Sequence, residues 1–224
     1  MNKNGIYSKN INPIVLTWGF FILLNLGFVV NGYSQKVIEK TWDADAFHKL
    51  EISSDEVYKI KIIAEPTSEI KLISQIEGEN YENLNIGASE KNKTLTLKPT
   101  YRPYFKPKND KLAAHKVIST EMILTIPESM EVAISAKIAS LEIQGSLQKL
   151  DVNLKDGHCF LKDFVGNARI NTREGDITVY AQHWVAGKAI SKYGIIKNEL
   201  VSKGKYLIKA ESVNGNISLL KTRE

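Results

Sequence analysis

Hydrophobic and polar residues alternate with a period of two along most of the chain after Gln35. The alternating segments are short and rich in Ile, Leu, Val, Thr and Tyr, and they cover Val57–Ala64 (VYKIKIIA), Glu69–Ile76 (EIKLISQI), Lys93–Lys98 (KTLTLK) and Glu121–Pro127 (EMILTIP). Turn-forming stretches separate them, namely EPTSE, EGENYEN, GASEKN and PES. Short alternating runs with turn signals between them predict an all-β protein. The only helical feature we expect is a single turn in KLAAH, residues 111–115.

The alternation becomes more regular from Glu131 onward. In EVAISAKIASLEIQ, one face of a strand is expected to carry Val132, Ile134, Ala136 and Ile138. Further on, four segments align on a glycine: KDGHCFL, REGDITV, KYGIIKN and VNGNISL. Separated by 18, 19 and 21 residues, these glycines are Gly157, Gly175, Gly194 and Gly215. A period near 20 with one strand–turn–strand unit per repeat is typical of a solenoid.

The residues after each glycine repeat as well. The second residue after the glycine is apolar in every unit: Cys159, Ile177, Ile196 or Ile217. A coil of strands turns a corner on each lap, and corners often need the positive φ that glycine adopts freely. We therefore expect the four glycines to be structural corners and successive laps to pair in parallel around inward apolar rows. The charged residues Arg173, Glu174 and Asp176 then belong to a turn, since only the glycine between them recurs.

The GDITV and GNISL corners and the period near 20 resemble those of a bacterial family called putative adhesins, exported proteins of β-strand repeats with mostly unassigned function. The resemblance covers about residues 141–219 and is weaker upstream. It implies a single-stranded β-helix, usually right-handed, in agreement with the handedness of parallel crossovers. It brings no catalytic residues. The unit KYGIIKN departs from the pattern, because Ile195 replaces a polar residue and Asn198 an apolar one.

The first 34 residues differ from the rest of the chain. Lys3 and Lys9 precede an uncharged run, IVLTWGFFILLNLGFVV, which is followed by NGYSQ. This is the order of a secretory signal, so we expect cleavage between Ser34 and Gln35. An uncleaved anchor is the alternative, although the run is short for a membrane span of about 20 residues. The GYSQ ending is typical of Bacteroidetes-type signals and indicates a Gram-negative source.

The part after the signal is long enough for one domain with a real core. We expect residues 35–224 to form it, with irregular β laps over 35–139 and regular laps over 140–219, and with no membrane span. The net charge of the chain is +5, and removing Lys3 and Lys9 lowers it to +3. So mild a charge, together with export, argues against a nucleic-acid partner.

Basic charge is concentrated in residues 98–116, KPTYRPYFKPKNDKLAAHK, which hold six cations and one acid. The prolines exclude a central strand, so this segment is a loop or an edge. Aromatic rings beside cations suit an envelope glycan, a lipid headgroup or an envelope protein. The candidate ligand residues are Tyr101, Arg102, Tyr104, Phe105, Lys106 and Lys108. In the alternative interpretation, the rings only cover one open end of the coil.

Little in the sequence indicates catalysis. No metal-ligand spacing joins His48, His115, His158 and His183, and Cys159 takes the place of an inward small hydrophobe. We therefore expect no catalytic residue, no metal ligand and no cofactor. The alternative is a small polysaccharide lyase or hydrolase that uses carboxylates from one corner, Asp156, Glu174 and Asp176.

The sequence therefore predicts an exported, non-enzymatic module of the cell envelope, in the periplasm or at the surface, with an adhesin-like binding or structural role. The alternatives are the enzyme described above and a periplasmic stress or assembly factor of the same fold. The oligomeric state stays open. A β-helix whose last lap ends with NISLL could pair edge to edge through that strand.

Overall fold

The computed structural model describes residues 35–55, 57–78, 81–105 and 119–222. Residues 35–224 form one compact unit, which does not include residues 1–34. The expected signal, the helical turn over 111–115, and Lys106 and Lys108 of the basic loop lie outside the described residues. Within the described ranges, no helix is long and apolar enough to cross a membrane.

The prediction of an all-β protein is confirmed. The described residues form one sheet of 15 strands, two short 3₁₀ turns and no α-helix. The elements are β1 (Gln35–Asp43), η1 (Ala44–Ala46), β2 (Lys49–Ser54), β3 (Lys59–Glu65), β4 (Glu69–Glu77), η2 (Tyr81–Asn83), β5 (Leu84–Lys91), β6 (Thr94–Tyr101), β7 (Ser119–Pro127), β8 (Glu131–Ile138), β9 (Ser140–Asp156), β10 (Cys159–Glu174), β11 (Ile177–Ala181), β12 (Val185–Ser191), β13 (Ile196–Asn198), β14 (Tyr206–Asn214) and β15 (Ile217–Lys221).

The alternating segments lie where they were expected, in β3, β4, β6 and β7, but two local predictions were wrong. The stretch GASEK, expected in a turn, is the second half of β5, which pairs antiparallel with β6. Its side chains are mostly exposed, because this half of an edge strand lies beyond the core. In β8, Ile138 is 61% exposed, unlike Val132, Ile134 and Ala136. Strand β8 ends at Ile138, and the next residue, Ala139, takes the buried position instead.

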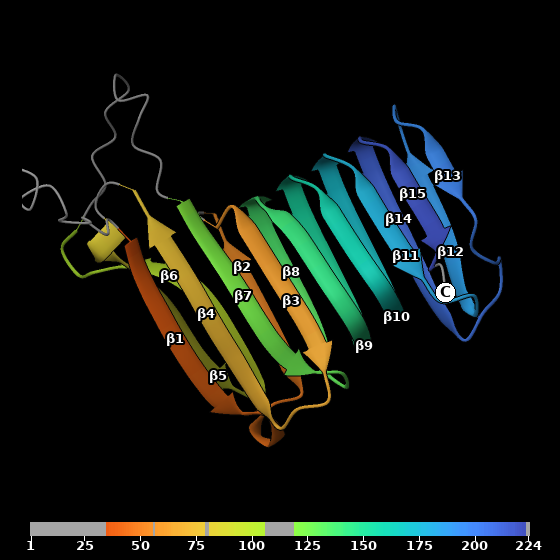
Figure 1. The fold of residues 1–224 in the computed structure, drawn as a ribbon. Coiled ribbons are helices and arrows are strands. Elements are labelled where there is room, and N and C mark those ends of the chain that lie inside the picture. The colour runs from red at the N-terminus through yellow and green to blue at the C-terminus, as the bar shows by residue number, and fades with distance from the viewer. Residues whose placement is uncertain (1–34, 56, 79–80, 106–118, 223–224) are drawn as a thin grey trace, which may run out of the picture. The chain divides into compact units, whose positions relative to one another are not determined.

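The strands are arranged in two series that share β9 and β10. The first series runs β1-β4-β7-β3-β9-β10-β11-β15-β13, and the second runs β5-β6-β2-β8-β9-β10-β14-β12. The long strands β9 and β10 join them, with their N-terminal parts in the first series and their C-terminal parts in the second. Figure 1 shows the two series as layers, and the sheet does not close on itself.

Stacked apolar rows fill the space between the two series. In one row, residues that are register partners on neighbouring strands follow one another, and each is at most 2% exposed: Leu141, Cys159, Ile177 and Ile217. The inward position expected for Cys159 is confirmed, and burial raises the pKa of its thiol to about 12. A thiol with so high a pKa stays protonated near neutral pH, so it is no nucleophile. Cys159 therefore serves packing.

Successive laps pair in parallel as expected, but the last two do not follow chain order. Strand β15 pairs with β11 on one side and with β13 on the other, so the lap of residues 206–221 lies between two earlier laps. Burial explains the order. The inserted lap brings Ile208, Ile217 and Leu219 to full burial, whereas the displaced lap has the polar Asn198 at the matching position. Strand β15 is therefore no free edge, and the expectation that NISLL could pair with a second copy was wrong.

The corner glycines form a column in the same order as the laps. A Cβ on Gly175 would lie 2.1 Å from the carbonyl oxygen of Gly157, and one on Gly215 would lie 1.9 Å from that of Gly175. Gly157 and Gly175 have positive φ, as expected. Gly194 and Gly215 do not have positive φ. At these two corners, glycine is required because the neighbouring lap comes too close to leave room for a Cβ.

The N-terminal end of the core is covered by β1. Lys36 Nζ and Lys40 Nζ each donate a hydrogen bond to a carbonyl oxygen of β5, both at 2.7 Å. Because β1 and β5 end the two different series, these bonds cross the end of the core. Inward lysines on an edge strand also hinder pairing with another chain. Burial, followed by repulsion from Arg102, lowers the pKa of Lys36.

Candidate ligand-binding face

The carboxylates of the alternative enzyme hypothesis lie at one corner but serve the corner itself. Arg173 contacts Asp156 at 3.4 Å and Glu174 at 3.1 Å, which ties two neighbouring laps together. Asp176 uses its Oδ1 to accept a hydrogen bond from the backbone N–H of Asn216, at 2.8 Å. A catalytic pair needs carboxylates that converge on one substrate position. Here, all three are held by neighbouring groups.

Asp176 belongs to a chain of hydrogen bonds that runs along the corner. The backbone N–H of Asp176 donates to His158 Nδ1, that of Asn216 donates to Asp176, and that of Ile195 donates to Asn216 Oδ1 at 2.9 Å. The side chains of His158, Asp176 and Asn216, each directly after a corner glycine, thus accept a hydrogen bond from the lap that stacks next to their own. Ile195 has no acceptor, so this corner chain ends at the lap that carries it. The sequence-based interpretation of these residues as a turn agrees with this geometry.

The described part of the basic loop is divided between core and solvent. Tyr101 packs against the hydrophobic core, and its ring centre lies 5.7 Å from that of Phe105. The backbone N–H of Arg102 donates to the carbonyl oxygen of Asn83. Tyr104 is fully exposed, with a φ of 69°. Tyr101 therefore fits the covering role, whereas Tyr104 is available to a partner. A ligand role for this loop stays a prediction.

A second surface, which the sequence analysis missed, lies on the outer face of the second series. Arg169 of β10 pairs with Lys209 of β14, which pairs in turn with Lys188 of β12. All three side chains are exposed. We call these three residues the basic row. Because neighbouring strands lie about 4.8 Å apart, the three cations are aligned across the strands at that spacing.

The basic row lacks neutralising partners among the residues that the structure describes. Asp151 faces Arg169 on the neighbouring strand, but its carboxylate contacts Lys149 Nζ at 2.9 Å instead. That hydrogen bond and ion pair raise the pKa of Lys149. No ion pair within these ranges joins Arg169, Lys188 or Lys209 to a carboxylate. Like charges directly opposite each other across strands are unfavourable, so the three cations of the basic row repel one another in the free protein.

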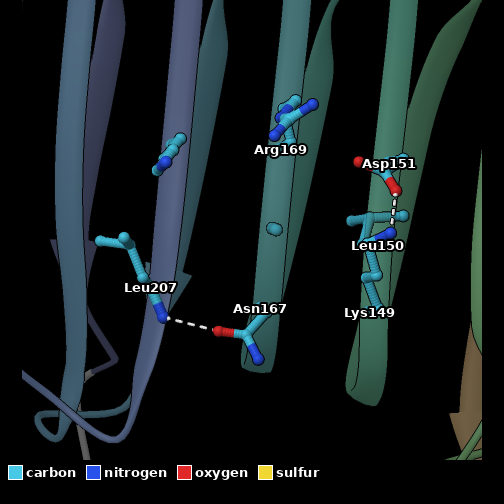
Figure 2. Close-up of a pocket in the computed structure, with 8 residues that line it drawn as sticks. Lys149, Leu150, Asp151, Asn167, Arg169 and Leu207 are labelled. Atoms are coloured by element: carbon cyan, nitrogen blue, oxygen red, sulfur yellow. Dashed lines mark hydrogen bonds and ion pairs between the residues drawn. The ribbon is translucent and has the colours of Figure 1, made fainter.

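A shallow groove of about 240 Å³ runs along this row between β9, β10 and β14. Figure 2 shows Arg169 beside Asp151, and the hydrogen bond of 3.1 Å in which the backbone N–H of Leu207 donates to Asn167 Oδ1. A second groove, of about 230 Å³, continues between β14 and β12 and shares Lys209 with the first. No aromatic residue lines either groove. The two grooves offer cations, an amide and aliphatic carbon to an extended ligand, and each also holds one carboxylate, Asp151 in the first and Glu211 in the second.

The repeat contains the signal for this surface. Asp151, Arg169, Lys188 and Lys209 each stand six residues before their corner glycine. Aligning that position, as well as the positions after the glycine, would have shown three cations in one column. Their order across the strands needed the structure, because the lap of Lys209 lies between those of Arg169 and Lys188.

No metal site is found in the described ranges, where no three His, Cys, Asp or Glu residues gather in a way that could hold an ion. The fold and this surface define the class: an all-β protein of stacked strands with a basic outer face. The molecule described as a "putative cell adhesion protein" from Clostridium sporogenes ATCC 15579 has a similar structure, with a TM-score of 0.59 and 19% sequence identity. The match covers 84% of this chain and 99% of that one. Such a likeness shows a shared fold.

A "putative adhesin" from Bacteroides fragilis NCTC 9343 is also similar, with a TM-score of 0.40 and 18% identity over 83% of this chain and 97% of that one. No protein-family model and no curated protein matches the sequence.

Proposed function

We propose that this protein is an exported, non-enzymatic binding module of the cell envelope that holds an anionic glycan on its basic row. One observation carries the proposal: three exposed cations on adjacent strands, with no carboxylate partner in the described ranges. This arrangement is unfavourable in the free protein, and a bound polyanion would neutralise it. Because the cations stand on paired strands, the spacing of their Cα atoms is fixed before binding.

The finer fold assignment belongs to the same proposal. We infer that residues 140–219 form laps of a right-handed single-stranded β-helix in which the last two laps have exchanged places. The parallel pairing of β9, β10 and β11 at offsets of one lap supports this. The similarity to the Clostridium sporogenes protein supports an adhesin-like role, and the signal-like N-terminal segment supports export to the periplasm or the surface.

A non-enzymatic role is favoured by the corner carboxylates. Asp156 and Glu174 share Arg173, and Asp176 is bonded to the next lap. A role as a stress or assembly factor is compatible with the same fold, and a pull-down from envelope extracts that recovers only proteins would favour it.

The test is binding of the purified protein to polygalacturonate, with neutral dextran as the comparison. The triple variant Arg169→Gln, Lys188→Gln and Lys209→Gln is expected to bind polygalacturonate roughly 3- to 150-fold more weakly, since exposed ion pairs contribute roughly 0.2–1 kcal/mol each. A control variant with the same charge change replaces Lys71, Lys91 and Lys93, which are exposed at the other end of the molecule. If the control loses as much affinity as the triple variant, net charge explains the binding and the basic row does not.

The basic loop is tested in parallel with Tyr104→Ser. Loss of binding in this variant, with the triple variant unaffected, would move the site to the loop. Equal binding of dextran and polygalacturonate would refute an anionic ligand.

A further inference from the structure

The outermost lap, residues 184–205, gathers exposed apolar side chains at one end of the molecule. Its strands β12 and β13 end the two series, as the right-hand side of Figure 1 shows. Tyr193 is 71% exposed and Ile195 is 78% exposed at the corner, and Ile190 is 64% exposed beside them. Trp184 and Ile196 are each 43% exposed. Single exposed apolar residues need no explanation, but a cluster of them does.

The same lap is rich in basic residues. Residues 184–205 contain five lysines and one acid, Glu199, a net charge of +4. The ammonium group of Lys192 lies 5.0 Å from the ring centre of Tyr193. The lap therefore combines rings and aliphatic chains with lysines, as segments that lie in the interface of an anionic bilayer do.

Two observations argue against a second copy of this chain as the partner. Two laps of charge +4 would face each other, and like charges across an interface are unfavourable. The corner chain of hydrogen bonds also stops at Ile195, whose side chain offers no acceptor to a further lap. A rigid protein partner would need pockets for side chains that project from a corner, whereas lipid rearranges around them.

From this we propose that the outermost lap docks on an anionic lipid surface, with Tyr193, Ile195 and Ile190 entering the headgroup region and the lysines contacting the headgroups. The corner residues Tyr193 and Ile195 lie outside the basic row, whereas Lys188 and Ile190 of the same lap also line the second groove. Docking through this end would leave the outer face of β10 and β14 open to solvent.

The experiment is co-sedimentation of the full chain with vesicles of phosphatidylcholine alone and with one quarter phosphatidylglycerol. The wild-type protein is expected to bind the anionic vesicles at least about tenfold more tightly, because several lysines near the surface contribute roughly 1 kcal/mol each. The variant Tyr193→Ser with Ile195→Ser is expected to lose about tenfold or more. Both residues are exposed, so unchanged thermal melting checks that the fold is kept.

The matched control is Lys71→Gln with Lys91→Gln, which lowers the charge by two at the other end of the molecule and leaves the outermost lap intact. It is expected to bind anionic vesicles within about twofold to threefold of wild type, because these cations lie away from the lipid. The proposal is overturned if the protein ignores both kinds of vesicle, if it binds both equally, or if the control loses as much as the corner variant. A concentration-dependent dimer that the corner variant abolishes would also overturn it, by assigning the lap to a second copy.

Discussion

Replacing Gly175 by alanine tests the close stacking of the corners. A Cβ there would lie 2.1 Å from the carbonyl oxygen of Gly157, so the two laps would have to separate. The residue also has a φ of 121°, which a residue with a side chain rarely adopts. Strained backbone costs about 1–3 kcal/mol, and overpacking costs about 1–3 kcal/mol more. We expect the free energy of unfolding to fall by about 2–6 kcal/mol, a large part of the usual 5–15 kcal/mol.

The assay is chemical denaturation followed by the strand signal in circular dichroism, with Gly87→Ala as the matched control. Gly87 lies in the edge strand β5, lacks positive φ, and its Cβ would first meet the side chain of Thr100 at 3.0 Å. A small shift of that side chain makes room, so a loss below about 1 kcal/mol is expected. If Gly175→Ala were no less stable than Gly87→Ala, the close stacking of the corners would be refuted.

Three further predictions test the interior, the corner and the lap order. Cys159, with its pKa raised to about 12, should resist iodoacetamide at pH 8 in the native protein and react fully in denaturant; fast native labelling would contradict its burial. Asp176→Ala should lower the free energy of unfolding by about 1 kcal/mol, while Asp176→Asn keeps an acceptor and loses less; equal stability of the two variants would argue against the corner chain. In a Cys159→Ser background, Thr178→Cys should form a disulfide with Ser218→Cys, its direct neighbour, but not with Lys197→Cys. A disulfide between Thr178→Cys and Lys197→Cys, detected by gel electrophoresis and mass spectrometry, would show that the laps stack in chain order.

Much of the fold could be predicted from local pattern. Alternation predicted the all-β class, because β-strands place successive side chains on opposite faces. The glycine repeat predicted parallel laps and the inward row that contains Cys159 and Ile177. The predictions that failed concern the order of the last laps and the end of β8. The order of the last laps depends on which of them is more apolar. At the end of β8 the alternation shifts by one residue, which leaves Ile138 exposed and Ala139 buried.

The candidate site was less predictable. The sequence predicted ligand binding at the basic loop, because aromatic and cationic residues are adjacent there. Two of the predicted residues, Lys106 and Lys108, lie outside the described residues. The basic row instead joins Arg169, Lys188 and Lys209, which are about 20 residues apart from one to the next. Their common distance from the glycine is visible in the sequence. Their order across β10, β14 and β12, with Lys209 between Arg169 and Lys188, follows only from the exchanged laps.

The salt dependence of polygalacturonate binding tests the central claim most directly, because it reports how many cations the ligand engages. Affinity for a polyanion falls with salt in proportion to the number of neutralised charges. For the triple variant of Arg169, Lys188 and Lys209, we predict a slope of log affinity against log salt that is shallower by about two than for wild type. The variant of Lys71, Lys91 and Lys93 should keep the wild-type slope. Equal slopes for wild type and the triple variant would contradict a glycan held on the basic row.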